Sequence, residues 1–221
     1  MTDSDYASRQ LRVIRSLMER ATIYRSISAP MALVGGLLSL GGFATAWYAE
    51  SVRHHSLTPG NFRTVWLVIL TLTAATNFFF LSRGAARRGE PFFSSGMKCA
   101  LLSLAPAFFV AGVLTITLHR PIELAVAWIT LYGLGLLGTQ HFAPRSLVAL
   151  GAVFLVAGGV LLCTWKHLFM PNPHLEPSAL VVSGIMAATF GGFHLVYAVA
   201  VGLLDEDRAD APAALNETGH V

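Results

Sequence analysis

A single histidine inside a long apolar stretch is the residue of this chain best placed to do chemistry. His194 occurs in the sequence Phe190-Gly-Gly-Phe-His-Leu-Val-Tyr197. Ionisable side chains inside membrane-spanning helices usually face the bundle interior and often mark proton or ligand sites. A lone histidine can equally be a neutral imidazole that hydrogen-bonds a neighbouring helix. Asn77, Tyr132 and Tyr197 are the other ligand or proton candidates, and Asn77 and Tyr132 lie at depths where either could bond to His194.

Other recognisable chemistry is absent from the sequence. There is no Walker loop, dinucleotide fingerprint, CxxC, HExxH or GxSxG motif, and no nucleophile with a neighbouring base. Several histidines and glutamates gather toward one side of the predicted membrane, and imidazole suits zinc, copper or nickel. Their spacing matches no known metal or haem site, so no catalytic residue, metal or cofactor is predicted. These residues are His54, His55, His119, His167, His174, Glu123 and Glu176.

The composition and the apolar runs define the class of protein. Of the 221 residues, 54% are hydrophobic and only 12% are charged, whereas a soluble domain carries about 25% charged residues. Six apolar runs each have about the length that a helix needs to cross the hydrocarbon core of a bilayer. They predict an all-α, polytopic membrane protein with six transmembrane helices. The runs are 30–48, 65–82, 99–118, 122–140, 147–165 and 179–204.

Lysine and arginine are distributed unevenly between the two sides of these spans. Eleven of the 15 lie in the segments on the side of the two termini, and an excess of Lys and Arg is typical of cytoplasmic loops. Both termini are therefore predicted to be cytoplasmic. The formal net charge of +3 reflects this asymmetry and does not indicate nucleic-acid binding. Arg87 and Arg88, between the second and third spans, belong to the predicted basic cytoplasmic face.

Residues 6–27 are predicted to form an amphipathic helix on the cytoplasmic side. Apolar residues recur at helical spacing on one face, and Arg9, Arg12, Arg15 and Arg20 lie largely on the other. Such a helix lies on an anionic membrane surface, packs on the bundle or binds a protein partner, and amphipathicity does not separate these alternatives. The predicted segments are residues 1–28 (amphipathic helix), 29–204 (transmembrane domain) and 205–221 (disordered cytoplasmic tail).

Small and aromatic residues are distributed along the spans in ways typical of membrane bundles. Glycines let helix backbones approach closely in lipid, so they predict a compact bundle, whereas a wide aqueous pore would need more polar residues. The glycines are Gly35, Gly36, Gly41, Gly42, Gly133, Gly135, Gly138, Gly151, Gly158, Gly159, Gly184, Gly191 and Gly192. Tryptophans and tyrosines near the outer ends of the spans predict an aromatic belt. They are Trp47, Tyr48, Trp66, Trp128 and Trp165.

Four short stretches resemble a family of bacterial six-span membrane proteins to which no activity is assigned. They are an LMER-type stretch at residues 17–24, a basic loop at residues 83–91, Tyr132-Gly133 and the stretch from Phe190 through His194 to Tyr197. The resemblance implies six helices in a bacterial inner membrane. Some members accompany small winged-helix regulators, which implies signalling.

Three functional hypotheses follow. The first is a non-enzymatic sensor or accessory protein whose basic cytoplasmic face meets lipid or a protein partner. The alternative is a small-solute or proton-coupled transporter that uses His194 and Asn77. The third is an intramembrane enzyme acting on a lipid or quinone. A polar cavity reaching His194 would favour the transporter, and a sealed, dry bundle would favour the sensor. Homo-oligomerisation stays open.

Overall fold

The chain folds into a bundle of helices long enough to span a membrane. The computed structural model describes residues 29–89, 95–141, 143–169 and 177–209, and all regular secondary structure there is helical. Six spans are long and apolar enough to cross a bilayer, which confirms the predicted all-α, multi-pass architecture. They are Ala29–Ser51, α2 (Pro59–Arg88), α3 (Ser95–Thr117), α4 (Pro121–Gly138), α5 (Arg145–Phe169), and a sixth span composed of α6 (Ala179–Met186), a π-helix η1 (Ala187–Phe193) and α7 (His194–Ala209).

Several helices extend beyond the apolar runs that predicted them. α2 has 30 residues and is about 45 Å long at 1.5 Å per residue, so its ends project past the hydrocarbon core. The Thr58 hydroxyl accepts from the Asn61 N–H at its start, and Gly89, with φ of 65°, ends it. α7 continues to Ala209, beyond the predicted boundary at residue 204. The predicted amphipathic helix with Arg9, Arg12, Arg15 and Arg20, and the tail from residue 210, lie outside the described residues.

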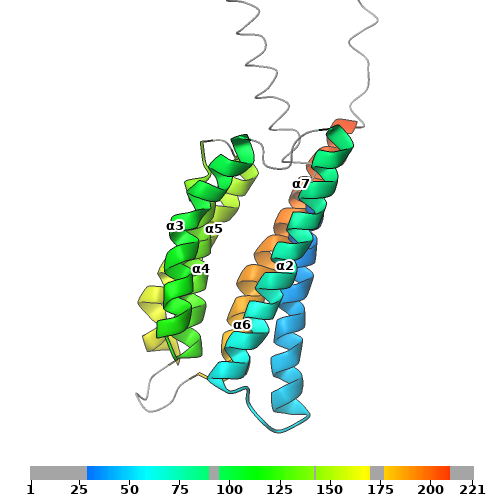
Figure 1. Cartoon of the computed structure of the whole chain (residues 1–221). Helices are drawn as coiled ribbons and strands as arrows, with labels where there is room; N and C mark the ends of the chain where they lie inside the picture. The colour runs from blue at the N-terminus through cyan, green and yellow to red at the C-terminus, as the bar shows by residue number, and fades with distance from the viewer. Residues whose placement is uncertain (1–28, 90–94, 142, 170–176, 210–221) are drawn as a thin grey trace, which may run out of the picture.

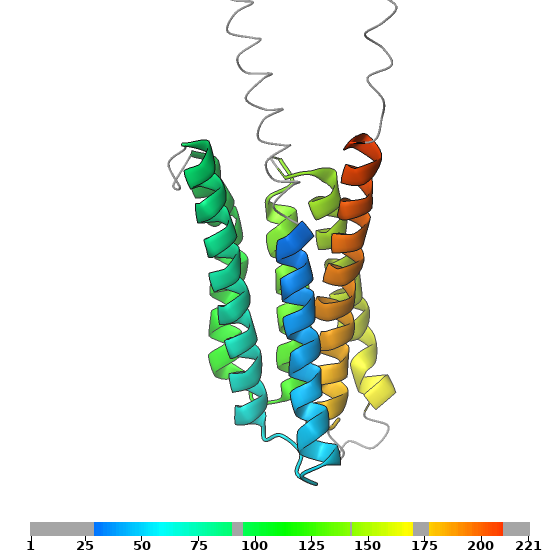
Figure 2. The same ribbon diagram turned by 90° about the vertical axis from the view of Figure 1, so that its right-hand side faces the viewer.

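The helices form two groups that lie side by side (Figures 1 and 2). One group contains α3, α4 and α5, and the other contains the helix Ala29–Ser51, α2 and the sixth span. α4 packs against α3 and α5 in its own group and also contacts α2 and α6 in the other. It has the largest buried share of the six spans, 44%. α4 is therefore the helix through which the two groups are mainly joined.

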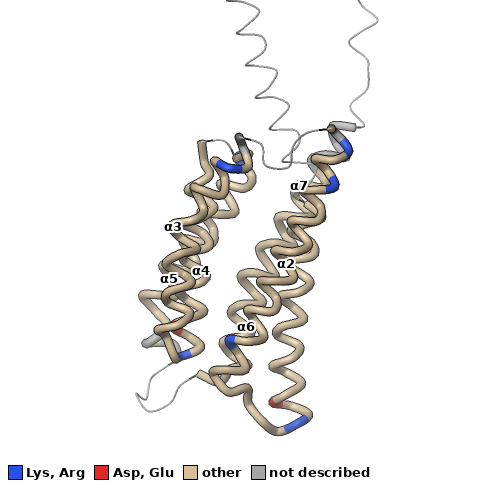
Figure 3. The backbone as a smooth tube through the Cα atoms, in the orientation of Figure 1, with Lys and Arg blue, Asp and Glu red and all other residues tan. Residues whose placement is uncertain are grey.

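The outer surface of the bundle suits lipid. Only 6% of the apolar 18-residue stretch of α2 and 11% of the corresponding stretch of α3 are buried. Large side chains such as Phe109 and Ile116 are exposed on α3. Charged residues gather at the two ends of the helices and leave an uncharged belt between them (Figure 3). An apolar belt between two charged ends is what a bilayer requires of a spanning bundle.

Glycines bring particular helices into close contact. A Cβ added at Gly133 of α4 would lie 2.5 Å from the Leu155 nitrogen of α5, and one at Gly36 would lie 3.2 Å from the Gly191 oxygen. Backbones therefore meet directly at these crossings, as predicted. Other glycines in the predicted set do not mark crossings, because a Cβ added there would meet nothing within 4 Å. These are Gly41, Gly159 and Gly192.

Candidate functional site

The sixth span is not the uninterrupted α-helix that its apolar run predicted. Residues 187–193 form a π-helix, and His194 is the first residue after it. A π-helix has a wider turn than an α-helix, is rare, and is frequent at functional sites. Gly191 and Gly192 favour this departure because glycine adds little to the stability of a regular helix. The sequence does not predict this change from an α-helical to a π-helical turn, because the span is apolar on all its faces and shows no hydrophobic period.

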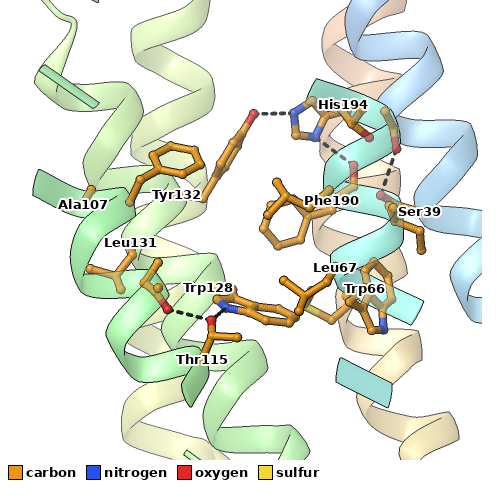
Figure 4. Close-up of a pocket in the computed structure, with 18 residues that line it drawn as sticks. Ser39, Trp66, Leu67, Ala107, Thr115, Trp128, Leu131, Tyr132, Phe190 and His194 are labelled. Atoms are coloured by element: carbon orange, nitrogen blue, oxygen red, sulfur yellow. Dashed lines mark hydrogen bonds between the residues drawn. The ribbon is translucent and has the colours of Figure 1, made fainter. Parts of the chain in front are cut away.

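His194 bridges the two helix groups through Tyr132 of α4 (Figure 4). The Tyr132 Oη and His194 Nε2 atoms are 2.8 Å apart, and His194 Nδ1 is 2.8 Å from the Phe190 carbonyl oxygen. A carbonyl only accepts, so Nδ1 must carry the proton and donate it. In the neutral ring Nε2 is then the acceptor, and the Tyr132 hydroxyl donates to it. Both ring nitrogens are thereby satisfied without charge.

Aromatic rings surround this pair. Phe154 of α5 is 0% exposed, and its ring centroid lies 4.8 Å from Tyr132, 5.0 Å from Phe190 and 5.2 Å from Phe193. The His194 ring is 5.4 Å from Phe154. These tilted and edge-to-face contacts are the arrangements that aromatic quadrupoles favour. The cluster draws α4, α5 and the π-helix together and packs apolar rings around the imidazole.

A cavity of about 280 Å³ lies between the two helix groups and reaches His194. Its walls come from the helix Ala29–Ser51, α2, α3, α4 and the sixth span, and they are overwhelmingly apolar. Figure 4 shows Tyr132 and His194 meeting across one end, with Trp128 and Thr115 near the other. The lining residues are Gly35, Ser39, Trp66, Leu67, Ile69, Leu70, Thr73, Ala107, Phe108, Ala111, Gly112, Thr115, Trp128, Leu131, Tyr132, Met186, Phe190 and His194.

The tryptophans do not all form the predicted aromatic belt. Trp47 is 51% exposed, as a belt residue should be, but Trp66 and Trp165 are each only 4% exposed. Trp66 and Trp128 both line the cavity, and the Trp128 Nε1–H donates to the Thr115 hydroxyl over 2.8 Å. The sequence does not show which tryptophans lie in an aromatic belt and which are buried in the bundle, because burial depends on which face of each helix turns inward.

The structure brings together some of the predicted site residues and separates others. Tyr132 is a hydrogen-bond partner of His194, as predicted. Asn77 is not: its Oδ1 is buried without a hydrogen-bond partner among the described residues, and it is not part of the cavity wall. Tyr197 is buried in the hydrophobic core. The aromatic ring of Phe154 carried no sequence signal that would distinguish it from other apolar residues of α5.

The charged residues lie at the helix ends. Arg87 is exposed at the end of α2, where Arg88 is the last helical residue. At the opposite end of α2, the Arg63 Nη2 atom donates to the Leu118 carbonyl just after α3, over 2.7 Å. This contact satisfies an unpaired carbonyl at a helix C-terminus and ties α2 to α3. The sequence does not predict it, because the charge of Arg63 does not show which carbonyl its side chain reaches.

The histidines and glutamates predicted to lie on the outer side do not converge in the described part of the chain. No group of three or more histidine, cysteine, aspartate or glutamate side chains gathers there in a way that could hold a metal ion. His54 and His55 are exposed, and His174 lies outside the described residues. Cys99 and Cys163 are free and exposed.

These features define a polytopic helical membrane protein with an apolar intramembrane cavity and a half-buried tyrosine–histidine pair. Comparisons with protein-family models, curated proteins and solved structures find no match to this chain. The resemblance to a bacterial six-span family therefore stays a prediction.

Proposed function

We propose that this chain is a membrane-embedded binding protein for a lipophilic molecule, and that it acts as a sensor or accessory protein rather than as an enzyme. The supporting observation is the apolar cavity of about 280 Å³ that reaches His194. A cavity of about 150 Å³ lined by Leu, Ile and Phe stays dry and binds benzene. A larger cavity of similar lining, set among lipid-facing helices, suits an apolar guest better than water.

The cavity gives less support to the small-solute transporter. A polar solute would leave most of its hydrogen-bonding groups unpaired against these walls, at a cost of several kcal/mol. His194 already bonds through both ring nitrogens, to Tyr132 and to the Phe190 carbonyl. A proton carrier would have to break one of these bonds on each cycle. The wall therefore favours retention of a lipophilic ligand over passage of a polar one.

Binding is tested with naphthalene, a rigid apolar probe, by calorimetry on the full chain in maltoside micelles. Ala111 lines the cavity, so Ala111→Phe should fill part of it and weaken binding at least tenfold. Ala152→Phe is the matched control, because Ala152 is exposed on α5 and outside the cavity wall. Ala107→Leu offers a second filled variant if Ala111→Phe lowers the melting temperature. Equal heats for the wild type and both filled variants would mean micelle partitioning only and would refute the binding site.

The sensor role requires that occupancy of the cavity alters the surface of the protein. Cys99 and Cys163 are free, exposed thiols on α3 and α5, and α3 forms one wall of the cavity. Saturating naphthalene should change the maleimide labelling rate of Cys99 by about threefold or more while Cys163 serves as the internal reference. Binding without any change at Cys99 would support a passive pocket and contradict the sensor.

We further propose that both termini face the cytoplasm of a bacterial cell, so that the basic face meets anionic lipid or a protein partner. Arg83, Arg87 and Lys98 are exposed near the α2–α3 connection, which is consistent with the predicted charge asymmetry. In a chain without its two native cysteines, Ser56→Cys should react with an impermeant maleimide in whole cells, and Ser94→Cys should not. The reverse labelling pattern would invert the orientation.

A further inference from the structure

We infer that the cavity takes a flat aromatic molecule that carries a hydroxyl group, of the phenol or quinol type, and that the hydroxyl donates a hydrogen bond to the Tyr132 oxygen. This inference rests on the proposed function and specifies the chemical class of its ligand. It follows from which hydrogen-bonding atoms the wall still offers and from the shape of the side chains around them.

The polar hydrogens at the two ends of the cavity are already committed to protein acceptors. The Tyr132 hydroxyl donates to His194 Nε2, and His194 Nδ1–H donates to the Phe190 carbonyl. At the other end, Trp128 Nε1–H donates to the Thr115 hydroxyl, which itself donates to the Ala111 carbonyl over 2.7 Å. Oxygen lone pairs therefore remain where hydrogens do not, and the Tyr132 oxygen is one such acceptor.

The remaining polar side chains do not reverse this balance. The Trp66 Nε1–H has no hydrogen-bond partner among the described residues, but this nitrogen is buried and points away from Tyr132 and His194 (Figure 4). The Ser39 hydroxyl donates to the Gly35 carbonyl over 2.9 Å. Thr73 makes no hydrogen bond among the described residues, and its hydroxyl can either donate or accept. Among the described residues no charged side chain lines the cavity, so a carboxylate or amine would lie there without a counter-charge, which is strongly unfavourable. At the Tyr132 end, where both polar hydrogens are committed, a neutral hydrogen-bond donor rather than an ion is therefore the complement of the wall.

The wall also favours a ring over an acyl chain. Aromatic side chains approach the cavity from three directions: Trp66 from α2, Trp128 from α4 and Phe190 from the π-helix (Figure 4). Such side chains gain from stacked and edge-to-face contacts with a flat ring, in addition to the area they bury. The volume of about 280 Å³ exceeds the roughly 150 Å³ that holds benzene, so a fused two-ring molecule has room.

The test compares three probes that share the naphthalene ring system: 2-naphthol, 2-methoxynaphthalene and naphthalene. Each is titrated calorimetrically into the full chain in maltoside micelles. One added hydrogen bond should make 2-naphthol bind about 3- to 10-fold more tightly than 2-methoxynaphthalene. The double variant Tyr132→Phe/His194→Leu removes both nearby acceptor atoms and keeps the wall apolar. In this variant the ratio of the 2-naphthol affinity to the 2-methoxynaphthalene affinity should fall to about one, whatever the change in naphthalene affinity. Tyr197→Phe, which removes a tyrosine hydroxyl outside the cavity wall, should keep that preference.

Each outcome bears separately on the two proposals. If all three probes bind the wild type equally, or if the methyl ether binds best, the hydroxyl-donor class is refuted while the lipophilic site stands. A hydroxyl preference that survives in the double variant would refute Tyr132 as the acceptor. If none of the three probes binds, both the ring class and the proposed binding function are overturned.

Discussion

The hydrogen bond between Tyr132 and His194 should be measurable as a coupling energy. The two side chains come from α4 and α7 and join the two helix groups, with 2.8 Å between Tyr132 Oη and His194 Nε2. Tyr132→Phe, His194→Leu and the double variant form a thermodynamic cycle in which their separate packing losses largely cancel. The term that remains is the interaction of the hydroxyl with the imidazole.

The size of this term is set by the membrane setting. Interhelical hydrogen bonds in a helical membrane protein average about 0.6 kcal/mol and reach about 1.7 kcal/mol. The surrounding rings place this bond toward the upper end, because Phe154 and Phe190 pack around Tyr132 with centroids 4.8 and 5.1 Å from its ring. We expect a coupling of about 1 to 1.5 kcal/mol. His194→Leu alone should cost more, since it also leaves the Tyr132 hydroxyl without its acceptor.

The assay is reversible thermal unfolding of the full chain in detergent. Near-ultraviolet circular dichroism monitors the loss of side-chain packing as the temperature rises. For a chain of this length 1 kcal/mol corresponds to about 2–4 °C in melting temperature, so the coupling should be resolved. His194→Gln keeps one donor and one acceptor and should lie within about 1 kcal/mol of the wild type. A coupling of zero within error would refute the bridging role of the bond, even if every single variant is destabilised. If His194→Gln restores stability but not the ligand response at Cys99, His194 has a role beyond packing.

Two further stability predictions have matched controls within the chain. Phe154→Ala removes a ring that is 0% exposed and should destabilise the protein by about 3 kcal/mol. Phe109→Ala, at a residue that is 73% exposed, is the control and should change stability by less than about 0.5 kcal/mol. Equal losses of stability in thermal melts would contradict the packing around Phe154. Gly133→Ala places a Cβ 2.5 Å from a backbone nitrogen of α5 and should lower the melting temperature by several degrees. In the control Gly159→Ala the added Cβ meets nothing within 4 Å, so this variant should be neutral or slightly stabilising. A lower melting temperature for Gly159→Ala than for Gly133→Ala would refute the α4–α5 crossing.

The spans could be predicted from the sequence because a bilayer imposes length and hydrophobicity on every spanning helix. The helix ends were less predictable. α2 begins at Pro59 and ends at Arg88, because capping groups and not hydrophobicity decide where a helix stops once it has left the hydrocarbon. The π-helix could not be predicted either. Its residues are apolar or small on all sides, so no change of period is visible.

The candidate site was only half predictable. His194 is recognisable from sequence as an ionisable residue in an apolar span, and depth alone limited its partner to residues such as Tyr132 and Asn77. Which of the two it contacts depends on helix rotation, and the structure selects Tyr132. The cavity belongs to no single segment. The cavity is space that five spans leave unfilled where α2 and α3 do not pack closely. The sequence of any one span does not predict such a gap, because it depends on how all five helices pack.

The position of the cavity links ligand binding to the stability of the bundle. The Tyr132–His194 bond lies at one end of a cavity whose walls come from both helix groups, so a ligand that fits would add contacts to each group simultaneously. Binding to the folded state alone raises stability by about 2.7 kcal/mol when the ligand is at 100 times its dissociation constant. That exceeds the coupling expected for the bond itself. Occupancy of the cavity would therefore change how firmly the two groups are joined more than the hydrogen bond can, which is the property that a membrane sensor requires of its ligand site.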